Sequence, residues 1–275
     1  MSEGLDARLI ASFCVAIALD VLMPVAAVLW ARRRLGVAWK VVWVGALAFT
    51  LSQLLTRVPL TQVAQYFLRD TLKASALAMH VWIAVLSVTA GLFEETARLI
   101  AFKFPLKDFR RWKDAVGFGL GHGGLESALL IAGMATLGLI NVIALSQMDL
   151  STLPLQPEQL EQVRAAKEKI TALRWWEPLL GAYERLTALI LHVALSVLVL
   201  QRFLRGQLRW YWLAVGFHAL ANEAAVLVAR AAGAVAAEGV MTVVALLALW
   251  IILRLRSEEP PQANTAPLNN EGLER

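Results

Sequence analysis

Long apolar runs constrain the fold of this chain more than any other feature. A membrane-spanning helix needs about 20 predominantly apolar residues. Seven stretches meet this requirement: 9–30, 39–56, 75–102, 114–146, 178–201, 210–229 and 234–253. Hydrophobic residues make up 59% of the chain and charged residues 17%, a composition that excludes an ordinary soluble domain. The sequence therefore predicts an all-α bundle of about seven transmembrane helices, or eight if one of the longer runs breaks.

The distribution of basic residues predicts the orientation of the bundle. The connection 31–40 holds four Lys or Arg residues, 103–113 holds five and 202–209 holds three. These are alternate connections, and basic loops stay on the cytoplasmic side of a membrane. We therefore expect the N-terminus outside and the C-terminus in the cytoplasm of an integral protein of the bacterial inner membrane. The net charge of +5 fits contact with anionic lipid and does not indicate nucleic-acid binding.

The chain is expected to form one transmembrane domain over residues 1–256. Its motif-bearing core covers about 80–225, and the segment 148–177 carries apolar residues at helical spacing, which predicts an extracytoplasmic amphipathic helix. A weaker amphipathic pattern occupies 60–73. The tail 257–275 has no apolar period and is expected to be disordered.

Several ionisable residues interrupt the apolar runs at one common depth. Glu94, His122 and His218 are each nine residues from the nearest basic residue at the predicted cytoplasmic end of their run, and His192 is ten from Arg202. At 1.5 Å per residue, all four lie roughly 14 Å below that surface. A charge within the hydrocarbon costs at least about 2.5 to 3.5 kcal/mol, so such groups indicate function. The four helices are expected to share one site.

Helical spacing groups further residues with these four. Arg98 follows Glu94 by four positions and Glu95 by three, Glu126 follows His122 by four, and Asn222 follows His218 by four. Two adjacent carboxylates near a histidine can activate a water molecule. A histidine and an amide on a facing helix can stabilise the oxyanion formed when that water attacks an amide. The pattern therefore indicates a peptidase, and five glycines around His122 predict close helix contact or close approach of a substrate there.

Three motifs in this order resemble those of a known superfamily. EETAR (94–98), FGLGH (118–122) and HALAN (218–222) are similar to the motifs of the CAAX prenyl protease and bacteriocin-processing superfamily of intramembrane glutamate proteases. More closely, GLGHGGLES and ERLTALILHVALSV resemble the YhfC-like intramembrane metalloprotease branch. The resemblance covers residues 80–225.

The resemblance implies a role for each matching residue. Glu94 or Glu95 would be the base that activates water with His122, and His218 with Asn222 would stabilise the oxyanion. Arg98 would anchor the glutamates, while Glu126 and His192 belong to the YhfC-like pattern. The prenyl protease motif has three residues between its second glutamate and its arginine, and this chain has two, so the choice between Glu94 and Glu95 stays open.

Two alternatives to metal-free glutamate catalysis remain. A Zn²⁺ ion could be held by His122, His192 and His218, because a catalytic zinc takes three protein ligands, although no HExxH motif supports it. A transporter or a non-catalytic membrane protein could use the same polar cluster as a proton or solute site. For the peptidase, the expected partners are a membrane-associated peptide or protein substrate and the lipid bilayer.

Overall fold

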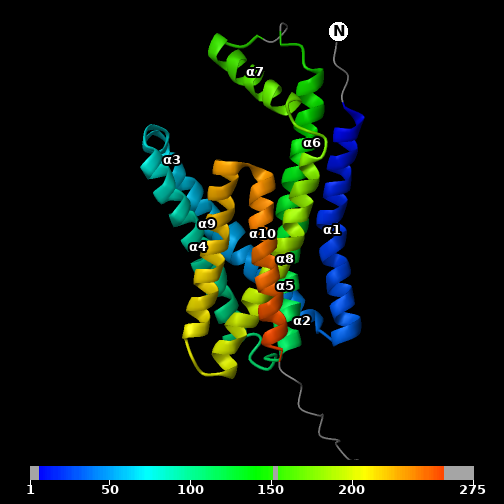
Figure 1. Ribbon diagram of the computed structural model, residues 1–275, viewed down its shortest axis with the longest axis vertical. Helices are drawn as coiled ribbons and strands as arrows, with labels where there is room; N and C mark the ends of the chain where they lie inside the picture. Colours follow the sequence, from blue (N-terminus) through cyan, green and yellow to red (C-terminus); the bar gives the residue numbers. More distant parts are fainter. Residues whose placement is uncertain (1–5, 151–153, 257–275) are drawn as a thin grey trace, which may run out of the picture.

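A computed structural model describes residues 6–150 and 154–256 and forms a bundle of long, roughly antiparallel helices (Figure 1). Within these residues, seven helical rods are long and apolar enough to cross a membrane, which confirms the predicted fold class and number of spans. The described residues contain no β-strand. The rods are α1 (Ala7–Leu35), α2–η1–α3 (Trp39–Phe49, Thr50–Arg57 and Val58–Ala74), α4 (Ala76–Lys103), α5–η2–α6 (Trp112–Leu125, Glu126–Ile131 and Ala132–Gln147), α8 (Glu177–Leu204), α9 (Arg209–Ala232) and α10 (Ala234–Arg254).

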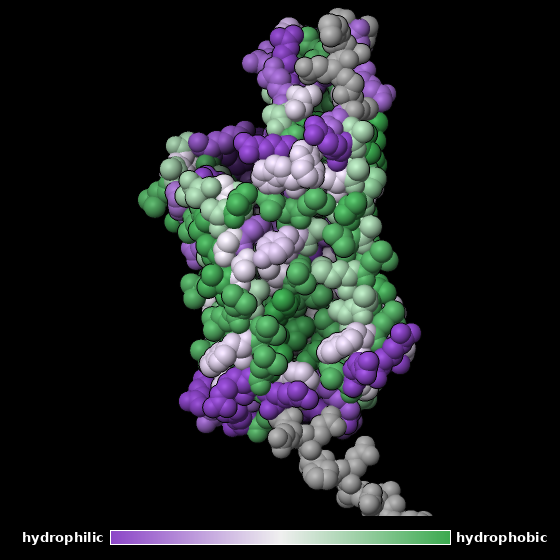
Figure 2. Space-filling model, turned by 45° about the vertical axis from the view of Figure 1, so that its right-hand side comes forward, coloured by the Kyte–Doolittle hydropathy of each residue, from purple (hydrophilic) through white to green (hydrophobic). Residues whose placement is uncertain are grey.

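The surface agrees with a membrane setting. Figure 2 shows a broad hydrophobic band around the middle of the visible face, with hydrophilic residues gathered at its upper and lower ends. Large apolar side chains such as Leu22, Trp43 and Val243 are more than 60% exposed. Since exposed apolar surface of this extent is unfavourable in water, the band is the lipid-facing part of the protein.

One predicted boundary differs from the structure. The second run was expected to end at residue 56, with a separate amphipathic helix at 60–73, but one rod continues from Trp39 to Ala74. Polar residues at 50–57 look like the end of a span in the sequence. They form the π-helical segment η1, and two of them, Ser52 and Gln53, are buried inside the bundle. The fourth run, predicted over 114–146, extends from Trp112 to Gln147 as expected and contains a second π-helical segment, η2.

The predicted amphipathic segment forms α7 (Pro157–Thr171), which lies beside α6 at the upper end of the bundle (Figure 1). None of its residues is buried, and Lys167 donates a hydrogen bond of 2.8 Å to the carbonyl of Met148. The predicted disordered tail, 257–275, lies outside the described residues.

Helix α8 is the centre of the bundle. In the most apolar stretch of 18 residues of α8, 72% of the residues are buried, against 11% to 44% in the corresponding stretches of the other spans. It packs against α1, α5, α9 and α10, and its side chains Leu195, Val197 and Leu200 belong to the main hydrophobic core. A residue on the inner face of α8 is therefore within reach of several other helices.

Glycines on α5 bring its neighbours unusually close, as the sequence predicted. A Cβ atom on Gly119 would lie 2.5 Å from the Cα of Val193 on α8, and one on Gly121 would collide with the backbone carbonyl of Val42 on α2. Only a residue without a side chain fits such backbone contacts. Because α5 touches α2 and α8 in this way, His122 comes to lie directly beside α8.

Candidate active site

Four helices place ionisable side chains in one buried cluster. Helix α4 supplies Glu94, Glu95 and Arg98, and single histidines come from α5 (His122), α8 (His192) and α9 (His218). Each of these six residues is at most 5% exposed. The structure thus brings together the residues that the sequence placed at one depth.

Glu94 is the centre of this cluster. Its Oε2 atom is 2.8 Å from Nε2 of His122, and its Oε1 atom accepts a hydrogen bond of 2.5 Å from Nε2 of Gln53. Arg98 approaches Oε2 to 3.7 Å, and nitrogen atoms of His192 and His218 each lie 3.8 Å from a Glu94 oxygen. Glu94 therefore faces all three histidines of the cluster.

Glu95 points to a different set of partners. It forms an ion pair with Arg98, and its Oε1 atom is 2.8 Å from Nδ1 of His218. Its Oε2 atom is buried and has no hydrogen-bond partner within residues 6–150 and 154–256. The two consecutive glutamates are therefore not equivalent, because only Glu94 contacts His122.

Arg98 and Glu126 determine which nitrogen of His192 carries a proton. Arg98 Nη2 is 2.7 Å from His192 Nδ1, and since a guanidinium only donates, Nδ1 must accept. The ring proton is then on Nε2, which lies 2.7 Å from Oε2 of Glu126. Glu126 is held in turn by Arg185 at 3.1 Å. His192 is thereby fixed in both orientation and tautomer.

Gln53 and Arg57 were not predicted as site residues. Gln53 is 5% exposed and donates to Glu94, while its own Oε1 atom accepts a hydrogen bond of 2.9 Å from Arg57. Both lie in η1, and π-helical segments inside membrane or soluble helices are frequent at functional sites. The signal in the sequence was the polar group Ser52, Gln53 and Arg57 within an otherwise apolar run.

Asn222 is close to this cluster but has no direct contact with Glu94. It lies one helical turn beyond His218 on α9, is half-buried and lines a cavity of about 250 Å³. Its side-chain amide makes no hydrogen bond to the part of the chain that the structure describes. The predicted pairing of Asn222 with His218 in stabilising an oxyanion remains a prediction.

Three of the clustered residues could hold a metal ion. Glu94, His122 and His192 each offer one ligand atom, and these atoms lie within 4.8 Å of one another. Two imidazoles and one carboxylate are a donor set that catalytic zinc uses in proteins. The buried Nδ1 atom of His122 also has no hydrogen-bond partner among the described residues. The residues present therefore fit a metal in donor type and spacing, and His192 would exchange its contact with Arg98 or with Glu126 for the metal.

This group differs from the predicted ligand set of His122, His192 and His218. Glu94 takes the place of His218, whose Nδ1 atom contacts Glu95 and whose Nε2 atom lies 3.8 Å from Glu94. His218 is therefore placed as a neighbour of the Glu/His/His group.

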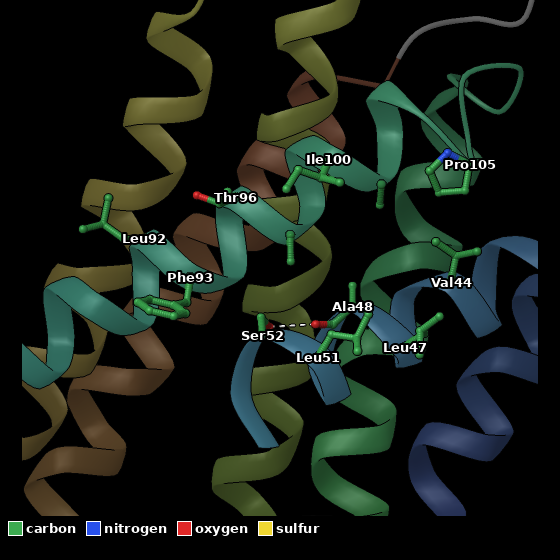
Figure 3. A pocket seen from close by; sticks show the side chains of 12 residues that line it. Val44, Leu47, Ala48, Leu51, Ser52, Leu92, Phe93, Thr96, Ile100 and Pro105 are labelled. Carbon is green, nitrogen blue, oxygen red and sulfur yellow. Dashed lines mark hydrogen bonds between the residues drawn. The ribbon is translucent and has the colours of Figure 1, made fainter. Parts of the chain in front are cut away.

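An apolar groove runs beside the cluster between α2–η1 and α4 (Figure 3). Its volume is about 490 Å³, and it extends from Pro105 to Phe93, the residue next to Glu94. The hydroxyl groups of Ser52 and Thr96 in its wall bond to Ala48 and Tyr211, at 2.7 and 2.9 Å. The groove offers an apolar surface whose lining includes the sequence neighbours of Glu94 and Gln53 but none of the side chains of the ionisable cluster.

Comparison with known proteins agrees with this arrangement. Residues 19–245 match the model of a family described as YhfC intramembrane metalloprotease. The chain belongs to this family. It is also 29% identical over 244 residues to a protein of Bacillus subtilis (strain 168) named "Uncharacterized membrane protein YhfC", an alignment that covers 87% of this chain and 93% of that protein. No solved structure matches the chain.

The YhfC match extends from α1 into α10 and includes every residue of the ionisable cluster. The description of the YhfC family suggests a metal-dependent peptidase, and the buried Glu94, His122 and His192 group could bind such a metal. The membrane setting named for the Bacillus protein agrees with the seven apolar rods of this chain.

Proposed function

We propose that this protein is an intramembrane peptidase that hydrolyses a peptide bond of a membrane-associated substrate. The observation that carries the proposal is the contact of 2.8 Å between Glu94 Oε2 and His122 Nε2 inside a buried cluster of three histidines. A carboxylate and an imidazole in contact can orient a water molecule and accept its proton as it attacks a carbonyl carbon.

The contacts of the two glutamates support Glu94 as the base. Gln53 fixes one oxygen of Glu94, and the other faces His122. Glu95 is held by Arg98 and His218 instead. Glu94 would take a proton from the attacking water and deliver it to the leaving amine, and Glu95 would hold Arg98 and His218 in place.

His218 and Asn222 are the proposed donors to the oxyanion. With both ring nitrogens protonated, His218 keeps Nδ1 on Glu95 and presents Nε2 toward Glu94, where the carbonyl would lie. Asn222 adds an amide one turn further along α9. Donors fixed before the reaction stabilise the developing negative charge without reorganisation.

A zinc ion, if bound, would be held by Glu94, His122 and His192 and would supply a Lewis acid that polarises the carbonyl and a more acidic water. Gln53 and Arg98 orient the Glu94 carboxylate under either route. Without zinc, Arg98 and Glu126 together orient His192, whereas with zinc Glu94 would be a ligand in place of the base and His192 would exchange one of these two contacts for the metal. The apolar groove, which is lined by Phe93 beside Glu94 in the sequence, would receive the apolar part of a membrane-associated substrate.

The test is turnover by purified protein in lipid nanodiscs. Membrane proteins from cells with wild-type protein and from cells with His122→Ala would first be compared to identify the cleaved peptide. We expect Glu94→Gln and His122→Ala to lower its turnover by about 10² to 10⁴, the usual contribution of an acid–base group. Glu95→Gln, which leaves the contact between Glu94 and His122 intact, should lower turnover less than Glu94→Gln does. Equal turnover by wild type, Glu94→Gln and His122→Ala would contradict the proposal.

Metal binding is tested separately by elemental analysis of the purified protein. If the Glu/His/His group is a zinc site, wild type should carry about one zinc per chain, and His122→Ala and His192→Ala should lose it. His218→Ala, which lies outside this group, is the matched control and should retain the metal. Turnover that survives a chelator in protein without zinc would instead support the metal-free route.

A further inference from the structure

A second, polar cavity adjoins the ionisable cluster. It has a volume of about 250 Å³ and is lined by Arg57, Ser87, Glu184 and Asn222 together with apolar side chains of α4 and α9. Arg57 donates to Gln53, and Gln53 donates to Glu94, so a single side chain separates the guanidinium from the proposed base. The cavity is therefore linked to the proposed hydrolytic site through the hydrogen bonds of Arg57 and Gln53.

Arg57 stands apart from the other arginines of the bundle interior. Its guanidinium donates to neutral oxygens of Thr89 at 3.2 Å, Gln53 at 2.9 Å and Leu86 at 2.5 Å. A guanidinium has five N–H groups, so two remain after these three bonds. Arg98 and Arg185 each contact two carboxylates, whereas Arg57 forms no ion pair with any described residue.

The other polar groups of the cavity do not neutralise this charge. Glu184 is held by Arg185 at 2.5 Å, and Glu94, whose charge also reaches Arg57, is shared with Arg98. The amide of Asn222 has no hydrogen-bond partner in residues 6–150 and 154–256. An arginine within a membrane is costly unless it is paired, and the strongest partner for its free N–H groups is a carboxylate.

We propose that Arg57 and Asn222 form a subsite that binds a carboxylate of the peptide substrate. This inference rests on the proposed peptidase function and adds a substrate class to it. An extended peptide advances about 3.5 Å per residue, and only Gln53 lies between Arg57 and Glu94. The carboxylate therefore belongs to a residue one or two positions from the scissile bond, either as the C-terminus or as an Asp or Glu side chain.

The subsite is tested by binding, which needs no turnover. Three probes are added to Glu94→Gln protein in nanodiscs: N-acetyl-Leu-Leu as the free acid, N-acetyl-Leu-Leu amide and N-acetyl-Leu-Asp amide. We expect one or both acids to bind about tenfold or more tightly than the neutral amide, because a hydrogen bond to a charged group contributes about 1.5 to 3 kcal/mol. The preferred acid shows whether a terminal or a side-chain carboxylate is recognised.

Substitutions of Arg57 and Asn222 test whether the preference for acids over the amide depends on this cavity. Arg57→Gln should bind acid and amide equally, and Arg57→Lys should keep part of the preference because it keeps the charge. Asn222→Leu removes the amide while Arg57 stays in place, and it should reduce the preference even if Arg57→Gln fails to fold. Equal binding of acids and amide, no binding of any probe, or a preference that survives Arg57→Gln would overturn the subsite.

The outcome is separable from the proposed peptidase activity. Loss of turnover in Glu94→Gln with no acid preference would leave a peptidase without this subsite. An acid preference that depends on Arg57, in a protein that cleaves no peptide, would leave a carboxylate-binding site and remove the hydrolytic function.

Discussion

At the scale of residues, each histidine of the cluster has its own orienting partner. His122 contacts Glu94, His192 lies between Arg98 and Glu126, and His218 contacts Glu95. Removing one member of a buried charged pair leaves its partner unpaired, which lowers the free energy of unfolding by several kcal/mol. Replacing a single member should therefore disturb stability as well as chemistry, and matched variants are needed to separate the two effects.

Gln53 gives the sharpest test at this scale. Gln53→Leu removes the hydrogen bond to Glu94 but keeps a side chain of similar volume. We expect kcat to fall about 10- to 100-fold, as for other residues that orient a catalytic group, while KM changes little. Ser52→Ala is the control, because that hydroxyl bonds only to backbone carbonyls of its own helix. If both variants keep wild-type kcat, Gln53 does not position the base.

At the scale of elements, both π-helical segments carry residues of the site. Gln53 lies in η1 and Glu126 in η2. A π turn holds one residue more than an α turn, so it rotates the following side chains away from the regular helical face. These two segments therefore decide which polar side chains of long membrane rods point toward Glu94 and His192.

The sequence predicted the elements better than it predicted their local geometry. Apolar runs identified the seven spans found among the described residues, and the similar distances of Glu94, His122, His192 and His218 from basic residues, nine or ten positions, placed them at one level. Gln53 was not predicted as a site residue because residues 50–57 look like the polar end of a span, and the sequence carries no periodic signal for a π turn. The Glu94, His122 and His192 group likewise depends on rotations of helices about their axes, which residue spacing alone does not determine.

Close helix packing leads to a prediction for α5. Gly119→Ala would place a methyl group against the backbone of α8 near His192, so the two helices must separate. We expect a loss of about 1 to 3 kcal/mol in the free energy of unfolding, the usual cost of overpacking, together with reduced turnover. Gly133→Ala is the control, since nothing lies within 4 Å of an added Cβ there. Similar unfolding curves for both variants in detergent would show that α5 and α8 do not depend on this contact.

At the scale of the whole molecule, α1 begins at one end of the bundle and α10 ends at the other (Figure 1). The connections 31–40, 103–113 and 202–209 lie at the end where α10 finishes, and hydrophilic residues gather there (Figure 2). The excess of Lys and Arg in these connections predicts that this end is cytoplasmic.

The single cysteine makes this orientation testable. In a Cys14→Ser background, Lys107→Cys in a basic loop and Gln159→Cys on α7 each introduce one exposed thiol, at opposite ends of the bundle. A membrane-impermeant maleimide added to intact cells should label the second and not the first, and both should react after the membrane is opened. Labelling of Lys107→Cys alone in intact cells would reverse the predicted topology.

The central place of α8 has a consequence for how the protein is made. This helix is the fifth of the seven rods in chain order, and α9 is the sixth. A ribosome therefore releases Glu94 and His122 well before it releases the two remaining histidines of the cluster. Half-synthesised copies lack the helix around which the others assemble, so the proposed hydrolytic chemistry would begin only when the chain is nearly complete. Neighbouring membrane proteins that are still being inserted would thus be protected from an unfinished enzyme.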